Sequence, residues 1–167
     1  MTKLAIIYHS AHGHTEHIAL RVLEGAQQVE GVEAHFIEAE EMATHPHDLV
    51  NFDGFILGSP TYLGGVSGPF KSFMDTTGRL WRQQGLVGKL AAGFTVSSLP
   101  AGDKQSTLLS ANRLGSWSGL MAQAGHSASA DSFVPGDVKG ARMFGRNFAN
   151  TLLRVNAKAQ RQETAEA

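Results

Sequence analysis

Short apolar runs alternate with segments of helical periodicity along the chain. Clusters of β-rich apolar residues predict strands at 4–8, 32–37, 52–57, 90–96 and 126–133. Apolar residues spaced three and four apart predict helices at 15–29, 40–47, 69–80, 105–124 and 141–155. The first, third and fourth strands are almost continuously apolar, which is typical of central strands in a parallel sheet.

Strands that alternate with helices predict an α/β fold: a doubly wound, five-stranded parallel sheet with helices on both faces. Ligands of such sheets bind beyond the carboxyl ends of the strands, where the strand order switches. We expect residues 1–156 to form one domain. Residues 157–167 are polar and are expected to be a frayed C-terminal tail.

Composition narrows the choice of function. Of the 167 residues 42% are hydrophobic and 17% charged, which fits a folded domain. The net charge of −1 gives no general attraction for nucleic acid or an anionic membrane, although a local basic patch is compatible with it. The chain has no cysteine, which excludes disulfides and thiolate chemistry and fits a cytoplasmic protein. No apolar run is long enough to insert into a membrane.

The first loop at the predicted ligand edge, Ser10–Thr15, suits a phosphate group. It offers hydroxyls at both ends, a glycine at position 13 and the N-terminus of the following helix. His12 and His14 add positive charge only when protonated. The loop has neither the Gly-Lys-Ser/Thr ending of a Walker loop nor the Gly-x-Gly-x-x-Gly fingerprint, so it suits one terminal phosphate. An ordinary strand-to-helix turn with a polar cap is the alternative.

The second and third loops follow the third and fourth strands. Residues 59–65 combine Pro60, Tyr62 and Leu63 with two glycines, which suits a flat ring whose polar edge needs backbone N–H groups. A surface loop with one exposed tyrosine is the alternative. Residues 97–103 can supply backbone donors to the other edge of a ring. Asp103 is expected to cap the next helix.

These motifs resemble the flavodoxin superfamily, in particular NAD(P)H:quinone oxidoreductases of the tryptophan-repressor-binding-protein type and NADPH-dependent FMN reductases. Ser10-x-His-Gly-His-Thr15 is similar to their phosphate loop, and Gly58-Ser-Pro-Thr-Tyr62 to the end of their third strand. Residues 67–81, which end in Leu-Trp, match the helix that follows. The resemblance covers residues 3 to about 125 and implies the flavodoxin-like strand order 2-1-3-4-5 and non-covalent FMN.

The resemblance also implies the residues that would contact FMN. They are Ser10, His12, Gly13, His14 and Thr15 at the phosphate, Pro60, Thr61, Tyr62, Leu63 and Gly64 along one side of the ring, and Ser97, Ser98, Leu99, Gly102 and Asp103 along the other. Trp81 is expected on the substrate side of the pocket, from the same chain or across a subunit interface. No protein acid or base is assigned, because the flavin carries the chemistry.

The implied function is hydride transfer from NAD(P)H to FMN, followed by electron transfer to a quinone or a similar flat acceptor. We expect a homo-oligomer, a dimer or tetramer, with a small-molecule electron acceptor and no nucleic-acid partner. A flavodoxin-type electron carrier and a non-catalytic binding or regulatory module stay open as alternatives. Leu99-Pro-Ala replaces a run of Gly and Thr of the family, and Gln123-Ala124 stands where the quinone oxidoreductases have a His pair.

The histidines do not predict a metal centre. Seven of the eight lie between positions 9 and 47. Zinc needs convergent ligands, and histidine spacing alone is weak evidence for them. Polar loop residues around a phosphate are the interpretation we prefer.

Overall fold

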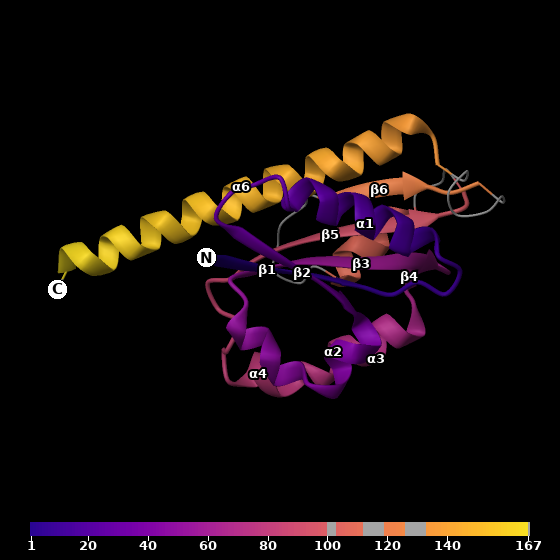
Figure 1. Cartoon of the computed structure of the whole chain (residues 1–167). Helices are drawn as coiled ribbons and strands as arrows, with labels where there is room; N and C mark the ends of the chain where they lie inside the picture. The colour runs from indigo at the N-terminus through magenta and orange to yellow at the C-terminus, as the bar shows by residue number, and fades with distance from the viewer. Residues whose placement is uncertain (100–102, 112–118, 126–132, 167) are drawn as a thin grey trace.

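A computed structural model describes residues 1–99, 103–111, 119–125 and 133–166. In chain order the elements are β1 (Thr2–Tyr8), α1 (His14–Ala26), β2 (Val32–Glu38), α2 (Ala39–Thr44), the 3-10 helix η1 (Pro46–Asn51), β3 (Gly54–Tyr62), β4 (Gly65–Val66), α3 (Gly68–Thr76), α4 (Gly78–Arg82), β5 (Leu90–Ser97), α5 (Asp103–Ala111), β6 (Gly119–Gln123) and α6 (Pro135–Glu166) (Figure 1).

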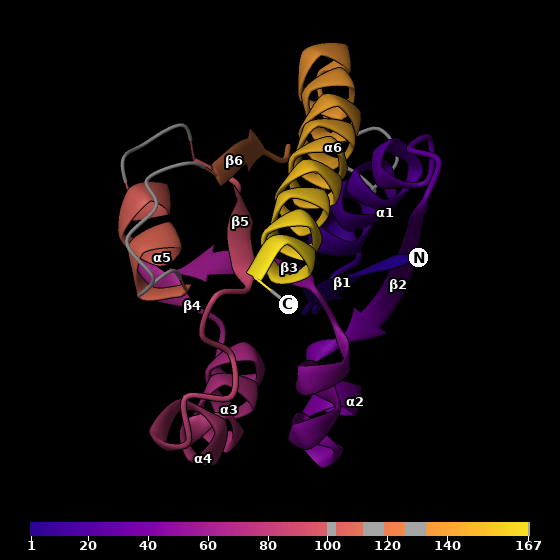
Figure 2. The ribbon, with the colours of Figure 1, turned by 90° about the vertical axis from the view of Figure 1, so that its left-hand side faces the viewer.

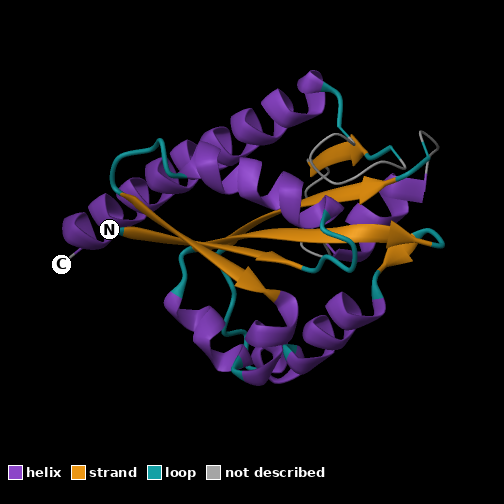
Figure 3. Cartoon of the chain, turned by 45° about the vertical axis from the view of Figure 1, so that its right-hand side comes forward, coloured by secondary structure: helices purple, strands orange, loops and turns teal. Residues whose placement is uncertain are grey.

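The sheet has the predicted topology. Its main strands are all parallel and run in the order β2-β1-β3-β5-β6, which is the predicted order 2-1-3-4-5 once the two-residue β4 is left out of the count. Strand β4 pairs antiparallel with the end of β3. Figure 3 shows the sheet between layers of helices, which confirms the doubly wound architecture.

Two hydrophobic cores lie on opposite faces of the sheet. Side chains of a strand point alternately to its two faces, and β1 supplies both cores in this way. Leu4 and Ile6 pack toward α1 and α6, whereas Ala5 and Ile7 pack toward α2 and α3. This is why a central parallel strand reads as continuously apolar.

The fifth large strand lies earlier in the chain than the sequence predicted. The helix predicted at 105–124 ends at Ala111, and residues 119–123 form β6. The helix prediction was therefore wrong at 119–123, and the strand predicted at 126–133 falls on residues of which 126–132 lie outside the described ones. The run Leu120-Met-Ala122 is too short to give a clear period, and pairing with β5 decides its conformation.

The last helix is longer than predicted. It begins at Pro135 and continues to Glu166, so residues 157–166, which we expected to be frayed, are helical in the structure. Side chains 157–162 are all exposed, and the domain boundary at 156 stays a prediction. Helix α6 packs along α1 at two glycines, Gly25 and Gly145, where the backbones meet directly (Figure 2). None of the described helices is both long and apolar enough to span a bilayer.

Candidate functional site

Parallel pairing brings the three predicted loops to one edge of the sheet. Tyr8 at the end of β1 lies beside Gly58 of β3, and Gly58 lies beside Phe94 of β5. Two residues further, Pro60 is in register with Val96. The chain therefore leaves β1, β3 and β5 at neighbouring points, and the loops at 10–15, 59–65 and 97–103 begin next to one another.

The first loop has the geometry of an anion cradle. Gly13 has a φ of 79° and lies directly before α1, a left-handed conformation that glycine adopts without strain. The first hydrogen bond of the helix runs from the His17 N–H to the Gly13 carbonyl. The N–H groups of the first turn have no partner within the helix and carry its positive dipole end.

The hydroxyl of Ser10 fits a phosphate. Its Oγ is buried and has no hydrogen-bond partner among the described residues. A buried hydroxyl left without a partner is unfavourable, and an anionic oxygen at the neighbouring helix N-terminus would satisfy it. Thr15 is only 2% exposed, so the side chain at the other end of the loop belongs to the interior.

The second loop is partly strand. Strand β3 continues through Pro60 and Thr61 to Tyr62 and turns back into β4, so the predicted loop 59–65 is the end of a strand and a tight hairpin. Leu63 and Gly64 have φ values of 49° and 76°, and the Leu63 side chain is fully exposed.

Hydroxyl contacts brace this hairpin. Ser59 Oγ accepts from the Ser67 N–H at 3.0 Å. Thr61 Oγ1 lies 2.7 Å from Thr95 Oγ1, which ties the hairpin to β5.

The third loop is held by a lysine that the sequence analysis missed. Lys104 is 7% exposed, and its ammonium donates to Ser97 Oγ at 2.9 Å and to the Leu99 carbonyl at 2.6 Å. The Gln123 amide reaches the Ser98 carbonyl at 3.4 Å. Gly102 lies outside the described residues, and Asp103 begins α5. The sequence offered one signal for this role of Lys104: a lysine in the first turn of a helix is disfavoured by the helix dipole, so its presence there needs another reason.

Several histidines lie in and beside the first loop. No group of three His, Asp or Glu side chains suited to a metal ion occurs within the described part of the chain. His9 Nδ1 lies 2.6 Å from Glu40 Oε1. The His17 ring stacks on Phe133, with centroids 5.4 Å apart, and burial lowers the pKa of His17. His14 contacts the edge of the same phenyl ring.

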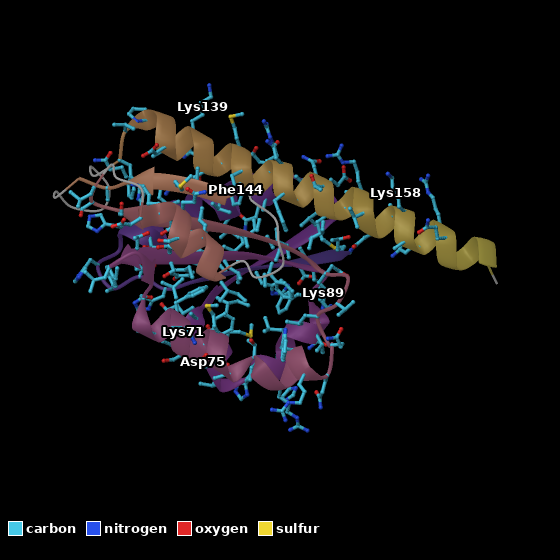
Figure 4. All side chains as sticks on the ribbon, turned by 180° about the vertical axis from the view of Figure 1, so that it is seen from behind. Lys71, Asp75, Lys89, Lys139, Phe144 and Lys158 are labelled. Atoms are coloured by element: carbon cyan, nitrogen blue, oxygen red, sulfur yellow. The ribbon has the colours of Figure 1, made fainter. Side chains whose placement is uncertain are left out.

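Trp81 is not brought to this edge within the chain. It lies on α4 and is 75% exposed. Lys89 follows α4 along the chain and lies directly before the amino-terminal end of β5. Its ammonium donates to the carbonyls of Val50 and Phe52, which precede the amino-terminal end of β3. Figure 4 labels Lys89 there, away from the loops at the carboxyl ends.

Comparisons with known proteins identify the relatives of this chain. Residues 2–132 match the model of the NADPH-dependent FMN reductase family. A protein named NAD(P)H dehydrogenase (quinone) from Acidithiobacillus ferrooxidans is 34% identical over 128 residues, which cover 66% of this chain and 64% of that protein. The quinone-oxidoreductase QR2 of Triphysaria versicolor is 31% identical over 86% of this chain and 80% of its own. The chain thus spans just under two thirds of the first relative.

A solved structure has the same fold. The WrbA-like flavodoxin protein of Agrobacterium tumefaciens superposes with a TM-score of 0.73 and 31% identity, over 92% of this chain and 99% of that one. A flavodoxin from the domain Archaea superposes with a TM-score of 0.68 over 90% of this chain and 99% of its own, and at 17% identity this likeness concerns the fold alone.

Proposed function

The chain belongs to the NADPH-dependent FMN reductase family, and we propose that it is an FMN-dependent oxidoreductase. It would take a hydride from NAD(P)H and pass the electrons to a quinone or a similar flat acceptor. The observation that carries the proposal is the buried, unpartnered Ser10 hydroxyl beside the N-terminus of α1, at the edge where three loops meet. Two relatives have names that include a quinone, which supports a quinone as the electron acceptor.

Each loop has a separate task in this proposal. Ser10, Gly13 and the first turn of α1 would hold the phosphate, with His12, His14 and Thr15 around them. The hairpin from Pro60 to Gly64 would cover one side of the ring. Ser97, Ser98 and Leu99, followed by Gly102 and Asp103, would border the other side.

When bound, FMN supplies the hydride acceptor, and the protein supplies orientation and exclusion of competing reactions. The fully exposed Leu63 and the half-exposed Tyr62 form an apolar rim beside the hairpin. A flat, apolar acceptor fits such a rim because it can bury both of its faces there. Lys104 holds the loop after β5, which would border the ring on the other side.

We further propose that the protein is a cytoplasmic dimer or tetramer. The exposed Trp81 and Val87, on and after α4, are large apolar side chains that a second subunit would cover. This arrangement would also give Trp81 its route to a neighbouring site. Light scattering on the purified protein would give the subunit number.

Titration of the purified apoprotein with FMN, followed by quenching of flavin fluorescence, tests the cofactor. Steady-state oxidation of NADH and NADPH, with and without a soluble quinone, then tests the reaction. We expect stoichiometric FMN binding and quinone-dependent turnover. Binding without turnover would favour the electron carrier, and a protein that refuses FMN would refute the proposal.

A further inference from the structure

The charges of the chain are separated in space. Helix α6 has six basic residues and no acidic one between positions 138 and 162, namely Lys139, Arg142, Arg146, Arg154, Lys158 and Arg161. Three acidic residues, Asp137, Glu163 and Glu166, lie near the two ends of α6, so the helix has a net charge of +3 and the rest of the chain −4. The overall charge of −1 therefore hides a basic helix on an acidic body.

The basic residues share one face of α6. At 3.6 residues per turn they fall within ~160° of the helix circumference and span ~33 Å along its axis. All six are exposed, whereas Ala141, Gly145 and Leu152 on the opposite side are buried against α1 and the sheet. Figure 4 shows Lys139 and Lys158 far apart along α6, on the side that faces away from the sheet.

These charges are poorly neutralised by the protein itself. Arg142 pairs with Glu24 at 2.7 Å. Lys139, Arg146 and Lys158 form no ion pair with any of the described carboxylate side chains, which in α6 end before residue 163. Arg154 donates to the backbone and hydroxyl of its own helix. A row of exposed cations attracts an extended anionic surface, and the attraction is strongest at low salt.

One apolar residue indicates which anionic surface fits. Met143 lies on the basic face between Lys139 and Arg146, and it is 44% exposed. A thioether gains from the apolar boundary beneath lipid headgroups, whereas a row of nucleic-acid phosphates offers it nothing. The first half of α6 is backed by α1 and the sheet, and its C-terminal end extends past them, so the basic face can lie along a plane without obstruction from the body (Figure 2).

We propose that the exposed face of α6 docks the protein reversibly on an anionic lipid membrane. Only Met143 would reach the apolar boundary, and the helix itself stays at the headgroups, because the apolar side of α6 is already occupied by the core. The inference goes beyond the proposed oxidoreductase activity and does not depend on FMN binding. If the acceptor is an apolar quinone, docking would place the site close to the bilayer in which such quinones dissolve.

Co-sedimentation of the full-length protein with vesicles tests the docking. We expect binding to phosphatidylcholine vesicles that contain phosphatidylglycerol, loss of binding at high salt, and none with phosphatidylcholine alone. The triple variant Lys139→Gln, Arg146→Gln, Lys158→Gln should bind about a hundredfold more weakly, because each basic residue at an anionic surface contributes about a fivefold factor. Met143→Ser should weaken binding at any salt concentration.

A matched control changes the net charge equally but elsewhere. Lys3→Gln, Lys71→Gln and Arg82→Gln neutralise three exposed basic residues, one of them in the exposed Lys71–Asp75 pair on α3 (Figure 4). This control should bind vesicles as the wild type does. If the α6 triple variant does not fold, Arg146→Glu alone should still weaken binding about 25-fold, since it removes one positive charge and adds a negative one.

Three results would overturn the docking. They are a wild-type protein that ignores anionic vesicles, an α6 variant that binds as well as the control, and tighter binding to duplex DNA than to vesicles at the same salt concentration. The last result would assign the face to nucleic acid. FMN titration of the same samples keeps this outcome separate from that of the oxidoreductase proposal.

Discussion

The ammonium of Lys104 lies 2.9 Å from the hydroxyl of Ser97, so the first turn of α5 holds the end of β5. The same ammonium donates to the Leu99 carbonyl. A lysine that is 7% exposed in a helical first turn is unfavourable by burial and by the helix dipole. Its two hydrogen bonds compensate for this by fixing the loop at the edge of the proposed flavin site.

Replacing Lys104 by methionine should loosen this loop. The variant keeps the side-chain length but removes two charge-assisted hydrogen bonds, so the free energy of unfolding should fall by about 1.5–3 kcal/mol. If about half of that loss is also a loss of FMN binding free energy, FMN affinity should fall by about four- to thirteenfold. Chemical denaturation and flavin fluorescence measure the two quantities. Lys71→Met, at an exposed position on α3, is the matched control and should leave both unchanged.

Replacing Ser10 by alanine should affect the free and bound protein in opposite directions. The apoprotein should be as stable as the wild type or slightly more stable, because the variant removes a buried hydroxyl that has no described partner. FMN affinity should fall about tenfold or more, because a hydrogen bond to a charged phosphate is lost.

Riboflavin provides the internal control for Ser10. It has the ring of FMN but no phosphate, so its affinity should be the same for the wild type and Ser10→Ala. Thermal melts and parallel titrations with both flavins give the result. An equal loss for riboflavin and FMN would place Ser10 away from the phosphate.

The contact between α1 and α6 tolerates no side chain at Gly145. A Cβ there would lie 1.9 Å from the Val22 carbonyl oxygen, so Gly145→Ala should push the helices apart and cost about 3 kcal/mol or more. At Gly140 in the same helix the nearest atom would be 3.7 Å away, and Gly140→Ala should stabilise the protein by about 0.5–1 kcal/mol. Urea denaturation compares the two, and similar effects of both would contradict the close packing.

Stability should fall on the acid side of neutrality because of His17. Burial against Phe133 lowers the pKa of His17 from its ordinary value near 6.5, with a smaller contribution from Arg21. The folded state therefore favours the neutral ring. Its contribution to stability is complete above pH ~6.5 and is lost as the pH falls through the lowered pKa.

His17→Gln should flatten this part of the pH profile, measured as the free energy of unfolding between neutral and mildly acidic pH. Phe133→Leu, which removes the stacked ring, should flatten it partly. An unchanged slope in His17→Gln would assign the acid sensitivity to another group.

Much of the fold could be predicted because local signals agreed with the tertiary structure. The runs at 4–8 and 90–96 are strands that both faces of the sheet bury, so composition alone marks them. The first loop was predictable because hydroxyls, a glycine and a helix start occur together in sequence. Residues 119–123 were predicted as helix rather than strand, because a five-residue edge strand is defined by its partner β5 more than by its own residues.

The sequence by itself determined the alternation of strands and helices and the position of three polar loops after three central strands, since burial of the strands dictates their composition. Only the tertiary structure decided that Lys104 returns to Ser97, that Trp81 lies away from the loops, and that six basic residues of α6 form one exposed face. Those relationships depend on how distant segments pack. Local sequence does not contain that information, because the same residue types also occur at ordinary solvent-exposed positions.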